Sequence, residues 1–235
     1  MQKDLPPVGF HSRPLVPQPP HSSAGRSVLL AGASGLVGAE VLDQLKADPS
    51  VSRIVVIARR PMPSLDPRIE ARVVDFNALD SNADLFAVDQ IFCALGTTMK
   101  QAGSKEGFRR VDFEYPLALA RLGVAHGARH FLLVSALGAD AESRIFYNQV
   151  KGELENALRT LGLRSVTIVR PSLLLGKRKE FRPFERLAMI VGEVVPGRYR
   201  PVRAKDVAKA LVTWARKDEP GLRIIESEQI KDAGT

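Results

Sequence analysis

Tyr147 and Lys151 are the residues of this sequence whose types and spacing most directly suggest chemistry. The segment Tyr147-Asn-Gln-Val-Lys151 places a phenol and an ammonium four residues apart, so on a helix both side chains lie on one face. An ammonium close to a phenol favours the phenolate form. A tyrosine in that setting can exchange a proton with a carbonyl or alcohol oxygen near neutral pH. An ordinary pair on a helix surface has the same spacing.

Ser135 is the third candidate for a catalytic residue. It ends an apolar run that is typical of a buried strand and lies twelve residues before Tyr147, so its hydroxyl could reach the same substrate oxygen. We therefore expect Tyr147, Lys151 and Ser135 to act together, with Tyr147 giving a proton and Ser135 polarising a carbonyl. We expect no metal site, because Cys93 is the single cysteine and the histidines are scattered. The four histidines are His11, His21, His126 and His130.

Three closely spaced glycines predict where a cofactor would bind. Gly32, Gly35 and Gly38 directly follow the apolar run Val28–Ala31 and open an amphipathic segment. A strand, a glycine turn and a helix in this order place backbone N–H groups and a positive helix end against a pyrophosphate. A glycine triplet alone also occurs in ordinary turns between a strand and a helix. Here both flanking elements are present, which favours dinucleotide binding.

The residues after the next predicted strands indicate which dinucleotide binds. Sites that prefer NAD place an acidic residue about 20 residues past the glycines, whereas this chain has Arg59-Arg60 at the end of its second strand. A guanidinium pairs with a 2′-phosphate that a carboxylate would repel, so we expect NADP(H). Asp75-Phe76 is placed to meet the adenine, and Gly96 would let the backbone pass close to the cofactor.

Composition excludes several other classes of protein. The formal net charge is +8, but aromatic residues are few and no nucleic-acid-binding motif is present, so we expect no nucleic-acid partner. No apolar stretch approaches the ~20 residues that would span a membrane. The proline-rich segment 1–26 has no apolar core and is therefore not a signal peptide. We expect a cytoplasmic protein, with segment 1–26 as a disordered extension.

The remaining apolar runs predict a doubly wound α/β fold with a parallel sheet. Continuous apolar strands that alternate with helices imply a sheet covered on both faces. The seven predicted strands are Val28–Ala31, Arg53–Ala58, Arg68–Val74, Gln90–Leu95, His130–Ser135, Val166–Val169 and Leu222–Ile225. The later helices are predicted at Asn82–Phe86, Phe108–His126, Arg144–Leu161 and Lys205–Lys217. Residues 27–235 would form one domain, in which 176–202 is a small cap that faces the substrate.

With these motifs together, the chain resembles the short-chain dehydrogenase/reductase superfamily and its NAD(P)-binding Rossmann fold. Within it, the chain resembles the atypical branch of the human Tat-interacting protein and its bacterial relatives. The resemblance extends from about Val28 to Val212. The motifs that carry it are Gly32-Ala-Ser-Gly-Leu-Val-Gly38, Arg59-Arg60, Val74-Asp-Phe76, Leu95-Gly-Thr-Thr98, Gly107-Phe-Arg-Arg-Val-Asp112, Ser135, Gly138-Ala-Asp140, Tyr147-Asn-Gln-Val-Lys-Gly-Glu153 and Arg170-Pro171.

The resemblance also implies roles for individual residues. The pyrophosphate would be lined by Ser34, Gly35, Leu36 and Val37. Leu95 would contact the cofactor, Tyr147 would be the proton donor, and Lys151 would hold the nicotinamide ribose. Arg182 matches a further arginine on the cofactor side. One departure is Asp112, which stands where many members of the superfamily have an asparagine that supports a proton relay.

Three functions follow from these observations. The first is an NADPH-dependent oxidoreductase that reduces a small carbonyl compound, and it is the one we favour. The second is a regulatory module in which bound NADPH changes contacts with a protein partner without turnover. The third is a sugar-nucleotide epimerase or dehydratase, which Arg59-Arg60 and the short stretch after Pro171 disfavour. The sequence leaves open the substrate and whether the chain forms a homodimer.

Overall fold

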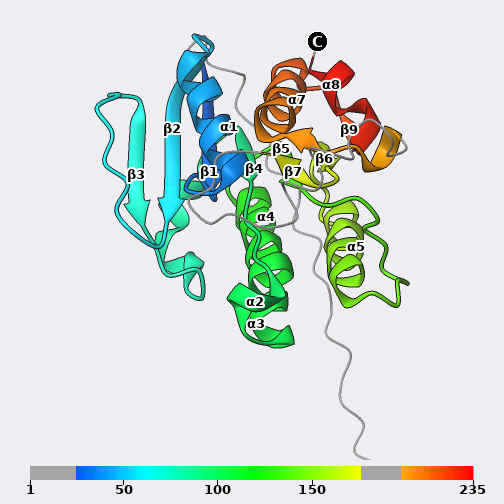
Figure 1. Ribbon diagram of the computed structural model, residues 1–235. Helices are drawn as coiled ribbons and strands as arrows, with labels where there is room; N and C mark the ends of the chain where they lie inside the picture. Colours follow the sequence, from blue (N-terminus) through cyan, green and yellow to red (C-terminus); the bar gives the residue numbers. More distant parts are fainter. Residues whose placement is uncertain (1–24, 176–196, 235) are drawn as a thin grey trace, which may run out of the picture.

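Seven strands pair into one parallel sheet in the order β3-β2-β1-β4-β5-β6-β9 (Figure 1). The strands are β1 Arg26–Ala31, β2 Val51–Ala58, β3 Ile69–Val73, β4 Gln90–Cys93, β5 His130–Val134, β6 Ser165–Arg170 and β9 Gly221–Glu226. The computed structural model describes residues 25–175 and 197–234. All seven predicted strands are confirmed. Most are apolar runs that can be recognised without their neighbours, whereas β3 carries Glu70 and Arg72 and is largely exposed.

The strand order creates a crevice between β1 and β4. The chain builds β1, β2 and β3 outward in one direction and then returns to place β4 against the other side of β1. The connections on either side of this point leave the sheet in opposite directions. Ligands of doubly wound sheets bind at the carboxyl ends of the strands at such a reversal, which here means after Ala31 and Cys93. Cys93 itself is buried, and burial raises the pKa of its thiol to about 12.

Helices cover both faces of the sheet, and each face has its own apolar core. Helices α1 (Leu36–Ala47) and α7 (Ala204–Lys217) pack on one face with α8 (Ile230–Ala233). Helices α4 (Tyr115–Ala125) and α5 (Phe146–Arg159) cover the other (Figure 1). The two-sided covering explains why the central strands are buried along almost their full length.

The helix predicted over Phe108–His126 is interrupted. The structure has a short helix α3 (Lys105–Arg109), a π-helical turn η2 (Arg110–Glu114) and then α4, and a further turn of helix, α2 (Met99–Ala102), precedes them. The wider turn of η2 has no signature in the apolar periodicity, which continues through it. π-Turns in helices often occur at functional sites, and this one carries Asp112.

The other elements are short. The 3₁₀ segment η1 spans Leu79–Phe86, and η3 (Gly197–Tyr199) and η4 (Ser227–Gln229) lie near the carboxyl end of the chain. Two-residue strands β7 (Leu174–Leu175) and β8 (Val202–Arg203) form a second parallel pair. Sequence periodicity did not predict this pair, because two residues have no period.

Two predicted segments lie wholly or mostly outside the described residues. These are the extension at 1–26 and the cap at 176–202, and Arg182 falls within the second. Arg26 is an exception, because it begins β1 and its guanidinium donates to Asp48 and Gln90. In the described part of the chain no helix is both long and apolar enough to cross a membrane.

Candidate active site

The glycine turn brings the backbone of β1, β4 and α1 into close contact. Gly32 has φ +94°, and a Cβ there would lie 2.5 Å from the carbonyl oxygen of Ala94. A Cβ on Gly38 would overlap the carbonyl oxygen of Gly32, so the first turn of α1 lies directly on the loop. Gly35 is the N-cap of α1, and no side chain caps the helix there. The amino end of α1 is therefore open toward the crevice.

The first of two cavities at this crevice contains the predicted arginine pair. It has a volume of about 480 Å³, and its wall includes Arg59, Arg60 and Phe76. In the described part of the chain, neither arginine forms an ion pair, so both guanidinium groups are free to meet an anion. The rings of Phe76 and Tyr115 lie 5.4 Å apart on the same wall. The cavity thus joins an apolar surface to two cations.

Two predicted cofactor residues do not line either cavity. Gly38 lies behind the turn, where its role is the close packing of α1 on Gly32. Asp75 is exposed and accepts hydrogen bonds from the backbone and side-chain nitrogens of Asn77, both at 2.9 Å. Its carboxylate holds the turn that aims Phe76 into the cavity.

The second cavity adjoins the first and brings together the predicted catalytic residues. It has a volume of about 430 Å³ and shares Gly35, Ala94, Leu95 and Gly96 with the first. The other predicted residues on its wall are Leu36, Val37, Ser135, Tyr147 and Lys151. Ser34 lines the first cavity. Side chains from β5 and α5 therefore meet the glycine turn across one continuous depression.

Lys151 forms an ion pair with a carboxylate inside this cavity. Its Nζ lies 2.7 Å from Oδ1 of Asp112, and both side chains are buried. Oδ2 of Asp112 accepts a hydrogen bond of 2.9 Å from the backbone N–H of Thr97. Burial alone would lower the pKa of Lys151, but the charges of Asp112 and Tyr147 outweigh it and raise this pKa. The ammonium is therefore held charged and fixed in position.

Ser135 is hydrogen-bonded to a buried ion pair that the sequence did not predict. Its Oγ donates to Oε1 of Glu155 at 2.5 Å. Glu155 in turn binds the guanidinium of Arg170 through both of its oxygens. Arg170 also donates to Glu226 at 2.7 Å. Because a hydroxyl has one proton, that of Ser135 is directed away from the cavity.

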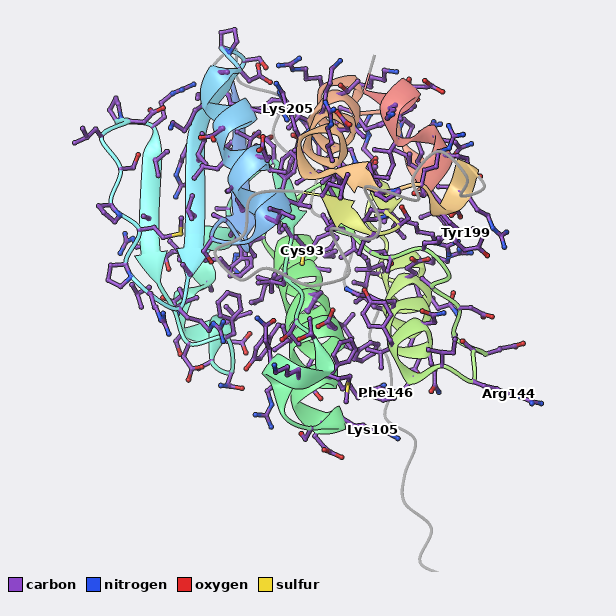
Figure 2. The ribbon with its side chains drawn as sticks, in the orientation of Figure 1. Cys93, Lys105, Arg144, Phe146, Tyr199 and Lys205 are labelled. Atoms are coloured by element: carbon purple, nitrogen blue, oxygen red, sulfur yellow. The ribbon has the colours of Figure 1, made fainter. Side chains whose placement is uncertain are left out.

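Tyr147 is positioned by aromatic contacts between α3 and α5. The ring of Phe108 is fully buried and lies 5.5 Å from that of Tyr147 and 5.7 Å from that of Phe146. Figure 2 shows Lys105 beside Phe146 where the two helices meet, with the ammonium 5.3 Å from the ring centroid. These contacts fix the first turn of α5, while 37% of Tyr147 remains exposed at the cavity.

Sequence reasoning missed several residues of the two cavities. Tyr115 and Met62 line the first, and Ser172 lines the second. Glu155, which lines neither cavity but accepts from Ser135, does have a signal in the sequence: it follows Lys151 by four residues and so lies on the same face of α5. The others are single residues without a pattern. Among the described residues no group of His, Cys, Asp or Glu side chains is arranged to hold a metal ion.

The two cavities fit an extended dinucleotide. The absence of a Cβ at Gly32 and Gly35 leaves the open end of α1 free to approach a pyrophosphate. The apolar cavity with Arg59 and Arg60 suits the adenosine half, and the cavity with Tyr147 and Lys151 suits the other half. Comparison with known proteins decides the family: a sequence profile described as NAD(P)H-binding matches residues 32–218.

The chain belongs to the NAD(P)H-binding family. It is 40% identical over 167 residues to the protein HTATIP2 of Rattus norvegicus, with 69% of each chain covered. It is 32% identical to the mitochondrial protein FMP52 of Eremothecium gossypii, with 87% of this chain and 95% of that protein covered. The predicted family, an atypical short-chain dehydrogenase/reductase branch with an NAD(P)-binding Rossmann domain, is therefore confirmed.

Solved structures of low sequence identity share the fold. The structure of MoeE5 in complex with UDP-glucuronic acid and NAD superposes with a TM-score of 0.68 at 18% identity, covering 86% of this chain and 76% of that one. UDP-N-acetylglucosamine 4-epimerase from Bacillus cereus superposes with a TM-score of 0.67 at 17% identity, covering 88% and 84%. The predicted Rossmann fold is therefore confirmed.

The expected cytoplasmic location is wrong. The fungal relatives from Emericella nidulans, Eremothecium gossypii and Candida albicans are all named as mitochondrial proteins. The expectation relied on the lack of an apolar segment at the amino end, a criterion that concerns secretory signals alone. Mitochondrial targeting uses amphipathic, arginine-rich segments, which that criterion does not detect.

Proposed function

We propose that the protein is an NADPH-dependent oxidoreductase that reduces a small carbonyl compound. The observation that carries the proposal is the convergence of Tyr147 and Lys151 on a cavity that adjoins the glycine turn. A proton donor and a fixed cation therefore border the place where the nicotinamide half of a dinucleotide would lie. Binding of NAD(P)H is a property of the family, and reduction of a carbonyl is the function proposed for this chain.

Each residue has a separate task in the proposed reaction. Bound NADPH would supply a hydride to the carbonyl carbon and become NADP⁺. The Tyr147 hydroxyl would give its proton to the carbonyl oxygen, which becomes the alcohol. Lys151 would hold the ribose and stabilise the phenolate left on Tyr147. Asp112 keeps Lys151 charged and fixes its position.

Arg59 and Arg60 support NADPH as the cofactor. Both line the first cavity and neither is engaged by a carboxylate within the described residues. They also count against the sugar-nucleotide epimerase reading, although proteins of that activity share the fold. Epimerases of this fold retain NAD, which has no 2′-phosphate for the arginines to bind. A regulatory module would bind NADPH in the same cavity and would differ from the oxidoreductase only in catalysing no reaction.

Replacing Tyr147 with phenylalanine tests the proposal. Turnover of a carbonyl panel, followed by NADPH absorbance, should fall by about 10²–10⁴-fold, the range for loss of a positioned general acid. NADPH affinity should change little, because only a hydroxyl is removed. Tyr199→Phe is the matched control: its hydroxyl accepts from Arg198 and Tyr199 lines neither cavity, so its turnover should stay near that of the wild type.

Two outcomes would contradict the proposal in different ways. If Tyr147→Phe turns over carbonyls as fast as the wild type, Tyr147 is not the proton donor. If the wild type binds NADPH and turns over no member of the panel, the protein is a cofactor-binding regulator rather than an enzyme.

A further inference from the structure

Two serine hydroxyls on the wall of the second cavity already serve as hydrogen-bond donors to other groups of the protein. Ser135 Oγ donates to Oε1 of Glu155, and Ser172 Oγ donates to the backbone carbonyl of Arg200, both at 2.5 Å. Both serines line the cavity that contains Tyr147. A hydroxyl carries one proton and two lone pairs. Toward the cavity, each serine can therefore offer only a hydrogen-bond acceptor.

The direction of the Ser135 bond follows from its partner. Glu155 is 1% exposed and is held by two nitrogens of Arg170, with Nη2 at 2.5 Å from one carboxylate oxygen and Nε at 3.1 Å from the other. Two nitrogens of one guanidinium donate to the two oxygens of Glu155, which is the geometry of an ion pair with a carboxylate. An ionised carboxylate accepts hydrogen bonds and cannot donate them. The Ser135 proton must therefore lie between Oγ and Glu155.

This polarity restricts what can bind opposite the serines. A carbonyl oxygen is itself an acceptor, so it gains nothing from Ser135 or Ser172. Tyr147 can donate, and it borders the same space. The carbonyl oxygen of a substrate is therefore expected at Tyr147, and the group that faces Ser135 must be a donor such as a hydroxyl. A buried acceptor without a donor costs free energy, so a substrate that lacks this hydroxyl binds less well.

The rest of the cavity wall is partly apolar. Val37, Met99, Leu173 and Leu174 contribute to it. These four side chains suit an alkyl or aryl group, while Lys151 and Asp112 on the same wall are paired with each other. An uncharged substrate with a polar end at Tyr147 and Ser135 and an apolar remainder matches both parts of the surface.

We propose that the substrate is a hydroxycarbonyl compound: an aldehyde or ketone that carries a hydroxyl close to the carbonyl carbon and an apolar remainder. The proposal rests on the carbonyl reduction proposed above and specifies its substrate class. Ser135 then selects the substrate by accepting from its hydroxyl. The product is a diol, in which the new hydroxyl lies at Tyr147 and the original one at Ser135.

A pair of ketones that differ only in the hydroxyl tests this inference. The measured quantity is the ratio of kcat/KM for 2-hydroxyacetophenone to that for acetophenone, with NADPH as the cofactor. The wild type should give a ratio of at least about 10, and Ser135→Ala should bring it close to 1. Ser135→Thr keeps the hydroxyl and should keep most of the preference. Ser172→Ala should lower the ratio by a smaller factor.

Three results would overturn the inference. A wild-type ratio near 1 shows that no hydroxyl is recognised. If Ser135→Ala lowers both values equally and leaves the ratio unchanged, Ser135 donates to the carbonyl itself. The third comes from a binding measurement that needs no turnover, in which 1-phenyl-1,2-ethanediol and 1-phenylethanol compete for the protein with NADP⁺ bound. Equal affinities for the diol and the alcohol contradict the proposal.

Failure of the proposed function gives a different pattern. If neither ketone is reduced while the diol still binds more tightly than the alcohol, the cavity recognises hydroxyls but the protein is not a carbonyl reductase. If acetophenone is reduced as well as its hydroxyl derivative, the reductase function stands and the substrate class is wrong. Thermal unfolding of each variant, together with its NADPH affinity, shows whether the fold is intact.

Discussion

The carboxyl edge and the amino edge of the sheet both contain buried charges, and those at the carboxyl edge border a cavity. At the carboxyl edge, the pair Lys151–Asp112 and the Ser135–Glu155 contact border the second cavity. At the amino edge, Asp48 accepts from Arg26 at 2.7 Å and from Arg216 at 2.8 Å. The same kinds of group therefore serve different purposes at the two edges.

The charges of the amino edge join elements that are far apart in the sequence. Asp48 follows α1, Arg26 begins β1 and Arg216 lies in the last turn of α7. The side-chain amide of Gln90, at the start of β4, donates to the carbonyl of Ala215 at 2.7 Å. This network closes the end of the α1–α7 face. Its role is structural, because each of these charged or polar side chains is hydrogen-bonded to another group of the protein.

The comparison teaches that access, rather than burial, distinguishes a reactive ion pair from a structural one. Lys151 and Asp48 are both almost fully buried. Lys151 lies beside a cavity and next to Tyr147, so its charge can act on a ligand. Asp48 is surrounded by its own partners. Variants at the two edges should therefore separate catalysis from stability.

The largest effect is expected where a buried ion pair also borders the cavity. Asp112→Ala leaves the Lys151 ammonium buried without its partner, which typically costs about 3–5 kcal/mol of stability. It should also reduce turnover, because Lys151 loses the contact that fixes its position. Urea unfolding and carbonyl reduction measure the two losses. Asp112→Asn retains an oxygen without the charge, so its stability and turnover should lie between those of the wild type and of Asp112→Ala. If Asp112→Ala leaves both stability and turnover intact, the ion pair is not needed for either.

Asp48→Ala should cost somewhat less stability and leave the site unchanged. It removes the acceptor shared by Arg26 and Arg216 and leaves two guanidinium groups close together. Because the Arg216 side chain is 53% exposed, the loss should lie somewhat below the value of about 3–5 kcal/mol for a fully buried pair. Urea unfolding gives this value, and a titration gives the NADPH affinity, which should stay within about twofold of the wild type. A loss of NADPH affinity without a loss of stability would contradict the distinction between the edges.

A smaller effect is expected from His130, which begins β5 at the amino edge. Burial lowers its pKa to about 4, with Arg164, Arg129 and Arg26 adding to the effect and Asp218 opposing it. In the unfolded chain His130 therefore takes up a proton near pH 6.5, whereas in the folded protein it does so only near pH 4. His130 therefore makes its full contribution to the free energy of unfolding above about pH 6.5, and this contribution is lost as the pH falls. Between pH 7 and pH 5 the loss of stability amounts to about 2 kcal/mol.

Urea unfolding at pH 7 and pH 5 measures this term for the wild type and for His130→Gln. The difference in stability between the two pH values should be about 2 kcal/mol smaller in the variant. An identical pH dependence would show that another group titrates in this range.

The sequence predicted the backbone parts of the site better than its charge network. The strands, the glycine turn and the helical spacing of Tyr147 and Lys151 are local patterns, and a local pattern can be recognised without knowing the fold. Asp112 pairs with Lys151 from within η2, a turn that joins two packed helical segments and has no pattern of its own in the sequence. Arg170 reaches Glu226 because β6 and β9 pair side by side. Such contacts depend on topology, and no spacing in the sequence indicates them.

A competition titration of NADPH against NADH tests the central claim, that the carboxyl edge is a site for NADPH. The wild type should prefer NADPH by about tenfold or more, since each charge-assisted hydrogen bond contributes about 1.5–3 kcal/mol before allowance for solvent exposure. Arg59→Ala/Arg60→Ala should bind the two cofactors alike. Arg72→Ala is the control, because Arg72 pairs with Glu70 on exposed β3 and does not line the cavity. A wild type without a preference, or a double variant that keeps one, would contradict the account.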